Sequence, residues 1–265
     1  MLFAAANLSF LFPDVPFPAR FSAARAAGFS AVEYLFPYAM PVADIRRHLS
    51  DNALKQVLFN LPPGNWEGGE RGLACLPQQR AAFRDSVALA REYAAGLNCT
   101  RLHCMAGVCP DDSDPLYRQT YLDNLAYAAT ELGGDGIVLL IEAINREDMP
   151  GYFLSDLDQA AAIVAGLRDS GIDNIALQFD LYHCAKMHGD VVSRLQKYAH
   201  LTEHFQIAGC PERNEPDTGQ VDFQSALKQT ARLAPGRYLG FEYKPVNDTV
   251  QGLQWMKSLA AAVTF

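Results

Sequence analysis

The feature that most constrains the fold of this chain is an eightfold alternation of short apolar runs with longer amphipathic stretches. Such a rhythm predicts repeated strand–helix units and a parallel sheet. We expect strands over residues 3–9, 31–36, 54–61, 100–106, 137–141, 175–179, 201–207 and 238–242. Helices are expected over residues 18–27, 78–95, 115–132, 155–167, 186–198, 223–233 and 250–262, with a further helix that starts at residue 41.

Eight strand–helix units in 265 residues have the size and rhythm of a closed (β/α)8 TIM barrel, a fold that takes about 250 residues. No compositional break divides the chain, so we expect a single barrel domain over residues 1–265. A doubly wound open α/β sheet is the structural alternative. The turn over residues 9–14 argues against it, because it lacks the glycine-rich phosphate loop of that fold.

The composition excludes several classes of partner. A formal net charge of −8 leaves no basic surface for phosphate backbones, so we expect binding neither to nucleic acid nor to a membrane. The first six residues are apolar, but no Lys or Arg precedes Arg20, so they predict a strand and not a signal peptide. Six cysteines without a Cys-x-x-Cys pair predict reduced, buried thiols in a cytoplasmic protein. The sequence leaves a homo-oligomer open.

Residues 136–148 contain the most informative single stretch. Five consecutive apolar residues follow a glycine and run directly into Glu142, the pattern of a strand buried on both faces. A carboxylate at the end of such a strand loses hydration at a cost of several kcal/mol unless a cation or hydrogen bonds compensate. Glu142 is therefore predicted to have a functional role.

All eight predicted strands end in the same way. Each one delivers a polar side chain at its carboxyl end, where the strands of a barrel converge on the catalytic face. Eight such residues in register, four of them carboxylates, resemble the lining of a site. They are Asn7, Glu33, Asn60, His103, Glu142, Asp180, Gln206 and Glu242.

Four of these residues form a candidate metal site. Each follows a strongly apolar strand, and together they offer only oxygen ligands, which suit a hard divalent cation, Mg²⁺ or Mn²⁺. A bound cation would also keep three crowded carboxylates ionised. The four are Glu142, Asp180, Gln206 and Glu242. The alternative interpretation is that some of them are surface residues that happen to follow a strand.

Two histidines lie near these candidate ligands. His183 is expected in the loop after Asp180, either as a satisfied loop residue or as a catalytic one. His204 lies two residues before Gln206 and thus on the same side of the strand, one layer deeper. This position favours a core or supporting role for His204 over a ligand role.

The stretch over residues 62–77 breaks the rhythm, because it is too rich in glycine and proline for regular structure. It is a long functional loop or simply a long loop. Within it, Arg71 either clamps a substrate carboxylate or ties the loop to itself, and Trp66 is either a lid or an anchor. Lys244, which shares strand parity with Glu242, points inward or is a solvated strand-end lysine.

Several motifs together resemble the hydroxypyruvate isomerase family, which belongs to the xylose-isomerase-like TIM barrels and includes 2-oxo-tetronate isomerases. The resemblance runs from about Asn7 to Pro245, and the Pro-Gly-x-Trp and Gly-Glu-Arg-Gly stretch separates this family from general sugar epimerases. The motifs are NLPPGNW at residues 60–66, GERG at 69–72, IEAIN at 141–145, DLYH at 180–183, FQIA at 205–208 and EYKP at 242–245.

The resemblance implies a function and roles for individual residues. The implied reaction is aldose–ketose isomerisation of a short 2-oxo acid through a cis-enediolate, with hydroxypyruvate and tartronate semialdehyde as the leading pair and a four-carbon 2-oxo-tetronate as the close second. Glu142 and Glu242 are the implied proton-transfer pair. A divalent cation is implied at Glu142, Asp180, Gln206 and Glu242, and substrate contacts at His183, Arg213 and Asp148.

The sequence departs from the family pattern at four positions: Phe59, Gly209, Asp217 and Gln220. Three rival functions also stay open. A ketose 3-epimerase can use the same two glutamates on opposite faces of one carbon. A metal-dependent endonuclease of the same fold would want several strand-end histidines and a basic groove. A barrel that binds sugar acids without turnover would not need both glutamates.

Overall fold

The computed structural model describes residues 1–111, 113–259 and 263–264. The chain forms two compact units. Unit 1 comprises Met1–Leu35, Ala43–Val57 and Phe179–Phe265, and unit 2 comprises Phe36–Val42 and Leu58–Gln178. Two strands, β3 (Lys55–Asn60) and β6 (Ile175–Asp180), run from one unit into the other.

The strands of unit 2 are all parallel. The end of β3 pairs with β4 (Arg101–His103), β4 pairs with β5 (Val138–Glu142), and β5 pairs with β6. In this register Asn60 lies beside His103, and Glu142 lies beside Gln178. Polar residues from neighbouring strands thus reach the same edge of the sheet.

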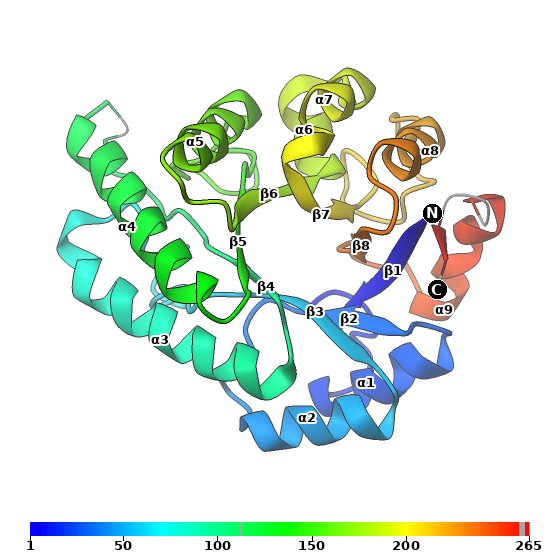
Figure 1. Ribbon diagram of the computed structural model, residues 1–265. Helices are drawn as coiled ribbons and strands as arrows, with labels where there is room; N and C mark the ends of the chain where they lie inside the picture. Colours follow the sequence, from blue (N-terminus) through cyan, green and yellow to red (C-terminus); the bar gives the residue numbers. More distant parts are fainter. Residues whose placement is uncertain (112, 260–262, 265) are drawn as a thin grey trace. The chain divides into compact units, whose positions relative to one another are not determined.

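The helices of unit 2 follow their strands in the expected order. They are α3 (Arg80–Leu97), preceded by the short 3-10 helix η1 (Pro77–Gln79), then α4 (Pro115–Gly133) and α5 (Leu157–Asp169). Figure 1 shows α3 and α4 side by side. The amphipathic pattern of α3 buries Phe83 and Val87, and the sheet contributes a core cluster of Leu58, Leu140 and Ala176.

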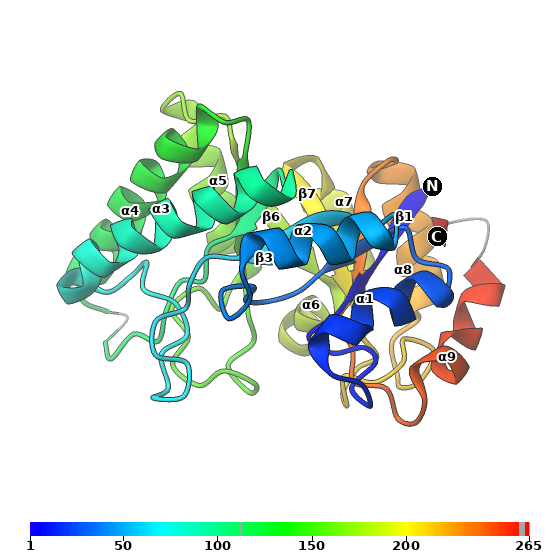
Figure 2. The same cartoon turned by 90° about the horizontal axis from the view of Figure 1, so that it is seen from below.

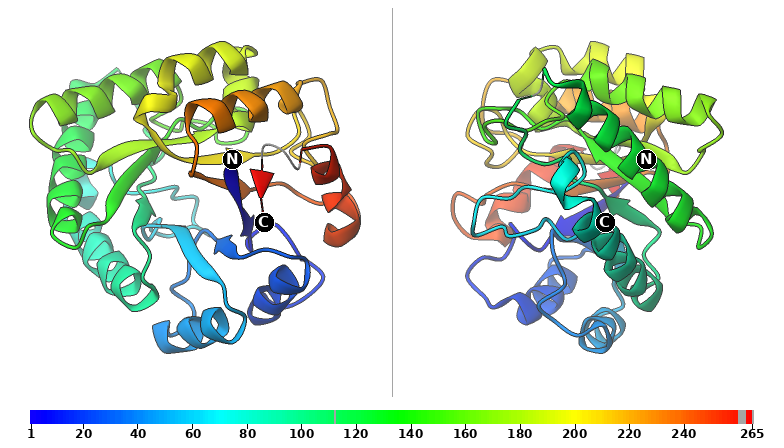
Figure 3. Two further views of the ribbon diagram at one scale, coloured as in Figure 1. Left: turned by 45° about the vertical axis from the view of Figure 1, so that its right-hand side comes forward. Right: turned by 90° about the vertical axis from the view of Figure 1, so that its left-hand side faces the viewer.

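Unit 1 is built on four parallel strands in the order β2 (Ala31–Glu33), β1 (Leu2–Asn7), β8 (Tyr238–Phe241) and β7 (Thr202–Ile207). Asn7 lies beside Glu33, and Gln206 lies beside Gly240. A two-residue strand, β9 (Val263–Thr264), pairs with β1, so that the two ends of the chain lie near each other (Figure 3).

The helices of unit 1 are α1 (Phe17–Ala26), α2 (Val42–Asp51), α6 (Leu181–His188), α7 (Val191–Tyr198), α8 (Phe223–Leu233) and α9 (Thr249–Gly252), with 3-10 helices η2 (Ala199–Leu201) and η3 (Leu253–Leu259). Figure 2 shows them from a second direction. Aspartates begin several of them: the side chain of Asp222 accepts a hydrogen bond from the Ser225 amide at the start of α8. Such caps satisfy amide groups that the helix itself leaves without partners.

The predicted fold class is confirmed by the strand topology. Hydrogen-bonded neighbours follow the order β2-β3-β4-β5-β6-β7-β8-β1-β9, and β2 also pairs with β1. Each of the first eight strands therefore has a neighbour on both sides, as an eight-stranded barrel requires. Most of the predicted strand and helix boundaries agree with the structure to within a few residues.

One predicted helix, over residues 186–198, was wrong. The structure has two helices there, because α6 begins directly after Asp180 and ends before Gly189, which has a positive φ of 74°. The Asp180 side chain accepts a hydrogen bond of 2.8 Å from the Tyr182 amide and so caps α6. His183, which we expected in a loop, consequently lies in the first turn of a helix. Residues 260–262 of the last predicted helix lie outside the described residues.

Within the described residues, no helix combines the length and the apolarity needed to cross a membrane. All six cysteines are free and buried, as the sequence predicted. Burial raises the pKa of the Cys75 thiol to about 12 and has the same effect on Cys184. A buried thiol with so high a pKa is a poor nucleophile, since the thiolate is the reactive form.

We therefore predict that Cys75 and Cys184 resist alkylation in the native protein. At pH 8 a thiol with a pKa of about 12 is ionised to about 1 part in 10⁴, whereas an ordinary thiol with a pKa of about 8.5 is ionised to about one quarter. Peptide mass spectrometry after iodoacetamide treatment should show both thiols unmodified in native protein and modified in denaturant. Equal labelling rates in the two states would contradict this prediction.

Candidate active site

In unit 1, a network of side chains joins Glu33, at the end of β2, to Asn7 on β1, to His204 and Gln206 on β7, and to Glu242, which directly follows β8. Asn7 donates from Nδ2 to Oε1 of Glu33 over 3.0 Å, and Gln206 donates from Nε2 to the same oxygen over 2.8 Å. His204 Nε2 lies 2.6 Å from the other oxygen, Oε2. Glu242 is joined to this group through Asn7 and Gln206. The network is buried, and Glu33 itself is 0% exposed.

Glu242 follows β8 directly and has hydrogen-bond partners at both carboxylate oxygens. Its Oε2 accepts from Asn7 over 2.8 Å and from Gln206 over 2.5 Å, and its Oε1 lies 2.5 Å from Nη2 of Arg213. Burial raises the pKa of Glu242 to about 8. The Arg213 guanidinium opposes this increase, whereas the carboxylates of Asp180 and Glu33 add to it.

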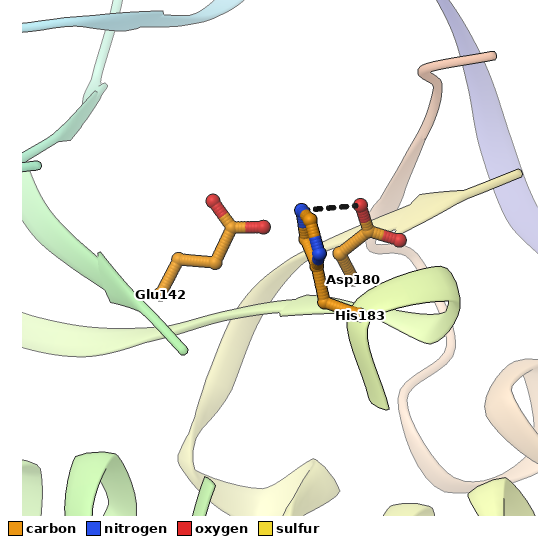
Figure 4. A group of neighbouring side chains, drawn as sticks. All are labelled: Glu142, Asp180 and His183. Atoms are coloured by element: carbon orange, nitrogen blue, oxygen red, sulfur yellow. Dashed lines mark ion pairs between the residues drawn. The ribbon is translucent and has the colours of Figure 1, made fainter. Parts of the chain in front are cut away.

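Asp180 and His183 lie at the start of α6, close to Arg213. His183 Nε2 is 3.8 Å from Oδ2 of Asp180, an ion pair that Figure 4 marks with a dashed line. Arg213 Nη2 is 3.9 Å from the same Asp180 oxygen. The Arg213 guanidinium also lies over the rings of Phe10 and Tyr182, 5.0 Å from each centroid. Aromatic faces attract a cation, and here they hold the guanidinium beside Glu242 and Asp180.

In unit 2, a second glutamate is held in a similar way. Gln178 on β6 donates from Nε2 to Oε2 of Glu142 over 2.9 Å, and His103 Nε2 lies 3.6 Å from that oxygen. The other ring nitrogen of His103, Nδ1, is 3.2 Å from Oδ1 of Asn60. Glu142 is 5% exposed. Each of the two candidate catalytic glutamates, Glu142 and Glu242, thus accepts a hydrogen bond from a glutamine amide.

Among the histidine, cysteine and acidic side chains of the described residues, one group could hold a metal ion: Glu142, Asp180 and His183, each of which offers one ligand atom. All three are buried, and Figure 4 shows their side chains. Two of them were predicted as metal ligands, while His183 was predicted only as a substrate contact. A carboxylate oxygen and an imidazole nitrogen are both common metal ligands.

The long loop over residues 62–77 lies in unit 2 and is held together by Arg71. Its Nη1 donates to the carbonyl oxygens of Trp66, over 2.7 Å, and Glu70, over 2.8 Å. The guanidinium lies 4.0 Å from the centre of the Trp66 ring, and that ring packs against Phe36 with a centroid separation of 5.1 Å. Of the two roles considered for Arg71, these contacts support the one in which it ties the loop to itself.

Two other predicted substrate contacts are solvent-exposed. Asp148 lies in the loop after β5, where Asn145 donates from Nδ2 to its carboxylate over 3.1 Å. Lys244 is exposed, and its backbone amide donates to the carbonyl oxygen of Arg213 over 2.8 Å. The main chain at Lys244 therefore supports the position of Arg213, whereas the ammonium group faces solvent.

The structure explains one departure from the family pattern. A Cβ atom at Gly209 would lie 2.4 Å from the carbonyl oxygen of Glu215 and 2.8 Å from that of Thr218. The loop after β7 folds back so closely that any side chain would clash. Phe59, a second departure, is fully buried next to Tyr38, whose hydroxyl donates to the carbonyl of Asn60. Nothing in the structure explains Asp217 and Gln220.

Sequence reasoning missed Gln178 altogether. It sits inside a predicted strand and carries no charge, so it did not stand out as a strand-end residue. Its position two residues before Asp180 was the available signal, because residues two apart on a strand share a face. Asn7 and Glu33 were recognised at strand ends but received no individual role.

The comparisons with known proteins agree on the family. The sequence matches the model of the family described as Xylose isomerase-like TIM barrel over residues 21–259. It is 45% identical to the 2-oxo-tetronate isomerase of Cupriavidus necator, a match that covers 96% of both chains. It is 39% identical to the hydroxypyruvate isomerase of Escherichia coli, covering 97% of this chain and 98% of the relative.

Solved structures show the same fold. A Brucella melitensis protein described as AP endonuclease, family 2, superposes with a TM-score of 0.93 at 39% identity, covering 97% of this chain and 98% of that one. A 3-keto-D-glucoside 4-epimerase from E. coli superposes with a TM-score of 0.80 at 15% identity, covering 97% of this chain and 99% of that one. At that identity the second likeness concerns the fold alone.

Proposed function

We propose that this chain, which belongs to the hydroxypyruvate isomerase family of xylose isomerase-like TIM barrels, is an isomerase of short 2-oxo acids. The observation that carries the proposal is the pair of buried glutamates, Glu142 and Glu242, each bound by a glutamine amide. The relatives that match nearly the whole chain are named as isomerases of hydroxypyruvate and of 2-oxo-tetronate. The family match spans both compact units, which supports a single working domain.

The proposed cofactor is a divalent cation, Mg²⁺ or Mn²⁺, held by Glu142, Asp180, Gln206 and Glu242. The donor set fits, because it consists of oxygen atoms only. The amide of Gln206 fits as well: its nitrogen faces Glu33 and Glu242, so its oxygen is directed away from both.

The proposed reaction is a proton transfer between neighbouring carbons through a cis-enediolate. One glutamate takes the proton from the hydroxyl-bearing carbon, and that glutamate or its partner returns a proton to the former carbonyl carbon. Burial raises the pKa of Glu242 in the metal-free protein, and a bound cation would oppose this increase and keep the carboxylate ionised as a base. When bound, the cation would stabilise the negative charge that develops on the substrate oxygens.

Arg213 and His183 are the proposed contacts for the rest of the substrate. Arg213 presents a guanidinium beside Glu242, and its planar fork matches the geometry of a substrate carboxylate. His183 lies in the first turn of α6, next to Asp180. Asp148, Arg71 and Lys244 are weaker candidates, because Arg71 is engaged within its own loop and the other two are exposed.

The substrate has two leading candidates. Our leading proposal is the isomerisation of hydroxypyruvate to tartronate semialdehyde. The close second is a four-carbon 2-oxo-tetronate, which has the support of the higher sequence identity to the Cupriavidus relative. Epimerisation at one carbon could use the same two glutamates, but the epimerase resembles this chain in fold alone. The six buried thiols support a reducing compartment such as the cytoplasm.

DNA cleavage is the remaining rival, because the similar Brucella protein is described as an endonuclease. The net charge of −8 does not favour it, since binding a phosphate backbone requires positive charge. Of the six histidines, all within the described residues, only His103 ends a strand. A multinuclear zinc site would need several such histidines.

The proposed substrate class can be tested by assaying purified protein. Purified protein with Mg²⁺ or Mn²⁺ should convert hydroxypyruvate or a 2-oxo-tetronate to its isomer, followed by proton NMR, with uptake of deuterium at the reprotonated carbon in heavy water. A panel of ketoses tests epimerisation, and a duplex with an abasic site tests cleavage. Turnover of neither 2-oxo acid would refute the proposed function.

The roles of the two glutamates can be tested by substitution. Glu142→Gln and Glu242→Gln should each lower kcat by about 10²- to 10⁴-fold, because an amide cannot carry the proton. Circular dichroism should show a native fold for both variants. Glu92→Gln, at an exposed position on α3, is the matched control and should keep full activity. Wild-type turnover by either site variant would remove that glutamate from the mechanism.

The proposed cation can be tested by removing it and adding it back. Dialysis against a chelator should abolish the isomerase activity, and Mg²⁺ or Mn²⁺ should restore it, because the proposed reaction needs a cation to stabilise charge on the substrate. Activity should be measured before chelation, after it and after each metal is added back. Full activity in demonstrably metal-free protein would rule out the proposed cofactor.

A further inference from the structure

Glu33 is a buried carboxylate that the proposed reaction does not use. It ends β2, is 0% exposed and receives hydrogen bonds from three side chains on two other strands: Asn7, His204 and Gln206. Taking a carboxylate out of water costs several kcal/mol unless such donors compensate. Because burying the Glu33 carboxylate is costly and its donors include two residues that contact Glu242, we looked for a role of Glu33 in supporting the candidate site.

The link from Glu33 to the site runs through two amides. Nε2 of Gln206 donates to Oε1 of Glu33 over 2.8 Å and to Oε2 of Glu242 over 2.5 Å. Nδ2 of Asn7 donates to the same two oxygens over 3.0 and 2.8 Å. If the Gln206 amide were turned over, its oxygen would face two carboxylate oxygens, which repel it. Glu33 and Glu242 together therefore fix which end of the amide faces away from them.

The backbone makes room for this carboxylate at Gly240. A Cβ atom built there would lie 2.2 Å from Oε1 and 2.4 Å from Oε2 of Glu33. Gly240 is also the partner of Gln206 in the pairing of β7 with β8. The missing side chain at position 240 thus leaves the space in which the Glu33 carboxylate can reach the Gln206 amide.

We infer that Glu33 is a positioning residue for the proposed site: it holds the Gln206 amide in the orientation that a ligand oxygen requires, and it steadies Glu242 through Gln206 and Asn7. This inference rests on the proposed function, because it assigns Gln206 and Glu242 to the cation. Partners that orient a metal ligand typically change metal affinity or activity by about 10- to 100-fold when removed. A group that only stabilised the core would change stability and leave the metal affinity of folded protein as it was.

The test measures Mn²⁺ binding to metal-free protein by the EPR signal of free Mn²⁺, so it does not depend on turnover. Glu33→Met keeps a side chain of similar length but removes the acceptor, and it should raise the Kd for Mn²⁺ by about 10- to 100-fold. Thr230→Val is the matched control: Thr230 is buried in α8 of the same unit and donates only to the Ala226 carbonyl. It should lower the thermal unfolding temperature and leave the Kd unchanged.

The conservative variant Glu33→Gln should rescue binding. Its Oε1 can still accept from Asn7 and Gln206, while its Nε2 would face His204. His204 Nδ1 has no hydrogen-bond partner among the described residues, so the imidazole proton can move to Nδ1 and leave Nε2 as an acceptor. We expect a Kd close to that of wild type, in contrast to the effect of Glu33→Met.

Gly240→Ala provides a second route if Glu33→Met fails to fold. Its added methyl group must displace the Glu33 carboxylate, and it should weaken Mn²⁺ binding in the same direction. A wild-type Kd in folded Glu33→Met or in folded Gly240→Ala would overturn the inference. If wild-type protein bound no Mn²⁺, the proposed cofactor would be refuted as well. If wild-type protein bound Mn²⁺ and neither of these two variants changed the Kd, only the role of Glu33 would be overturned.

Discussion

The site depends on one constraint: a carboxylate that is buried away from water needs hydrogen-bond donors or a cation to compensate for its lost hydration. Glu33, Glu142 and Glu242 are all nearly inaccessible to solvent, and each accepts hydrogen bonds from amide groups on other strands. A parallel strand delivers one side chain to a given face every second residue, so the donors must come from neighbouring strands in register. The pairing of Glu142 with Gln178 shows this directly, because the two residues lie side by side in the sheet. Strand register and site chemistry are therefore specified by the same residues.

Much of this arrangement could be predicted from the sequence. The apolar runs located the strands, and the polar residue at the end of each run, from Asn7 to Glu242, is buried in the structure. The family and the fold class were recognisable because several short motifs occur in the expected order, and both are confirmed. The catalytic and ligand roles of individual residues stay predictions, since they concern a bound substrate and a bound cation.

What the sequence could not supply were interactions decided by packing. The direction of the Gln206 amide follows from two carboxylates that are 173 and 36 positions away along the chain. The early start of α6 follows from Asp180, whose side chain caps the helix, and a pattern of apolar residues does not show which oxygen an aspartate uses for a cap. Arg71 was ambiguous for a similar reason, because a loop arginine can reach either a ligand or its own backbone.

Gly240 has a consequence for how such a chain can change over time. Because a methyl group at position 240 would occupy the space of the Glu33 carboxylate, a side chain at position 240 is disfavoured while the acid is kept. Replacement of the glycine becomes easier once the acid has been exchanged for a smaller residue, and loss of the acid leaves an opening that a larger residue can fill. The two positions lie far apart in sequence, yet we expect them to covary among relatives as if they were neighbours. Such a correlated pair would mark the chains that share this form of the site.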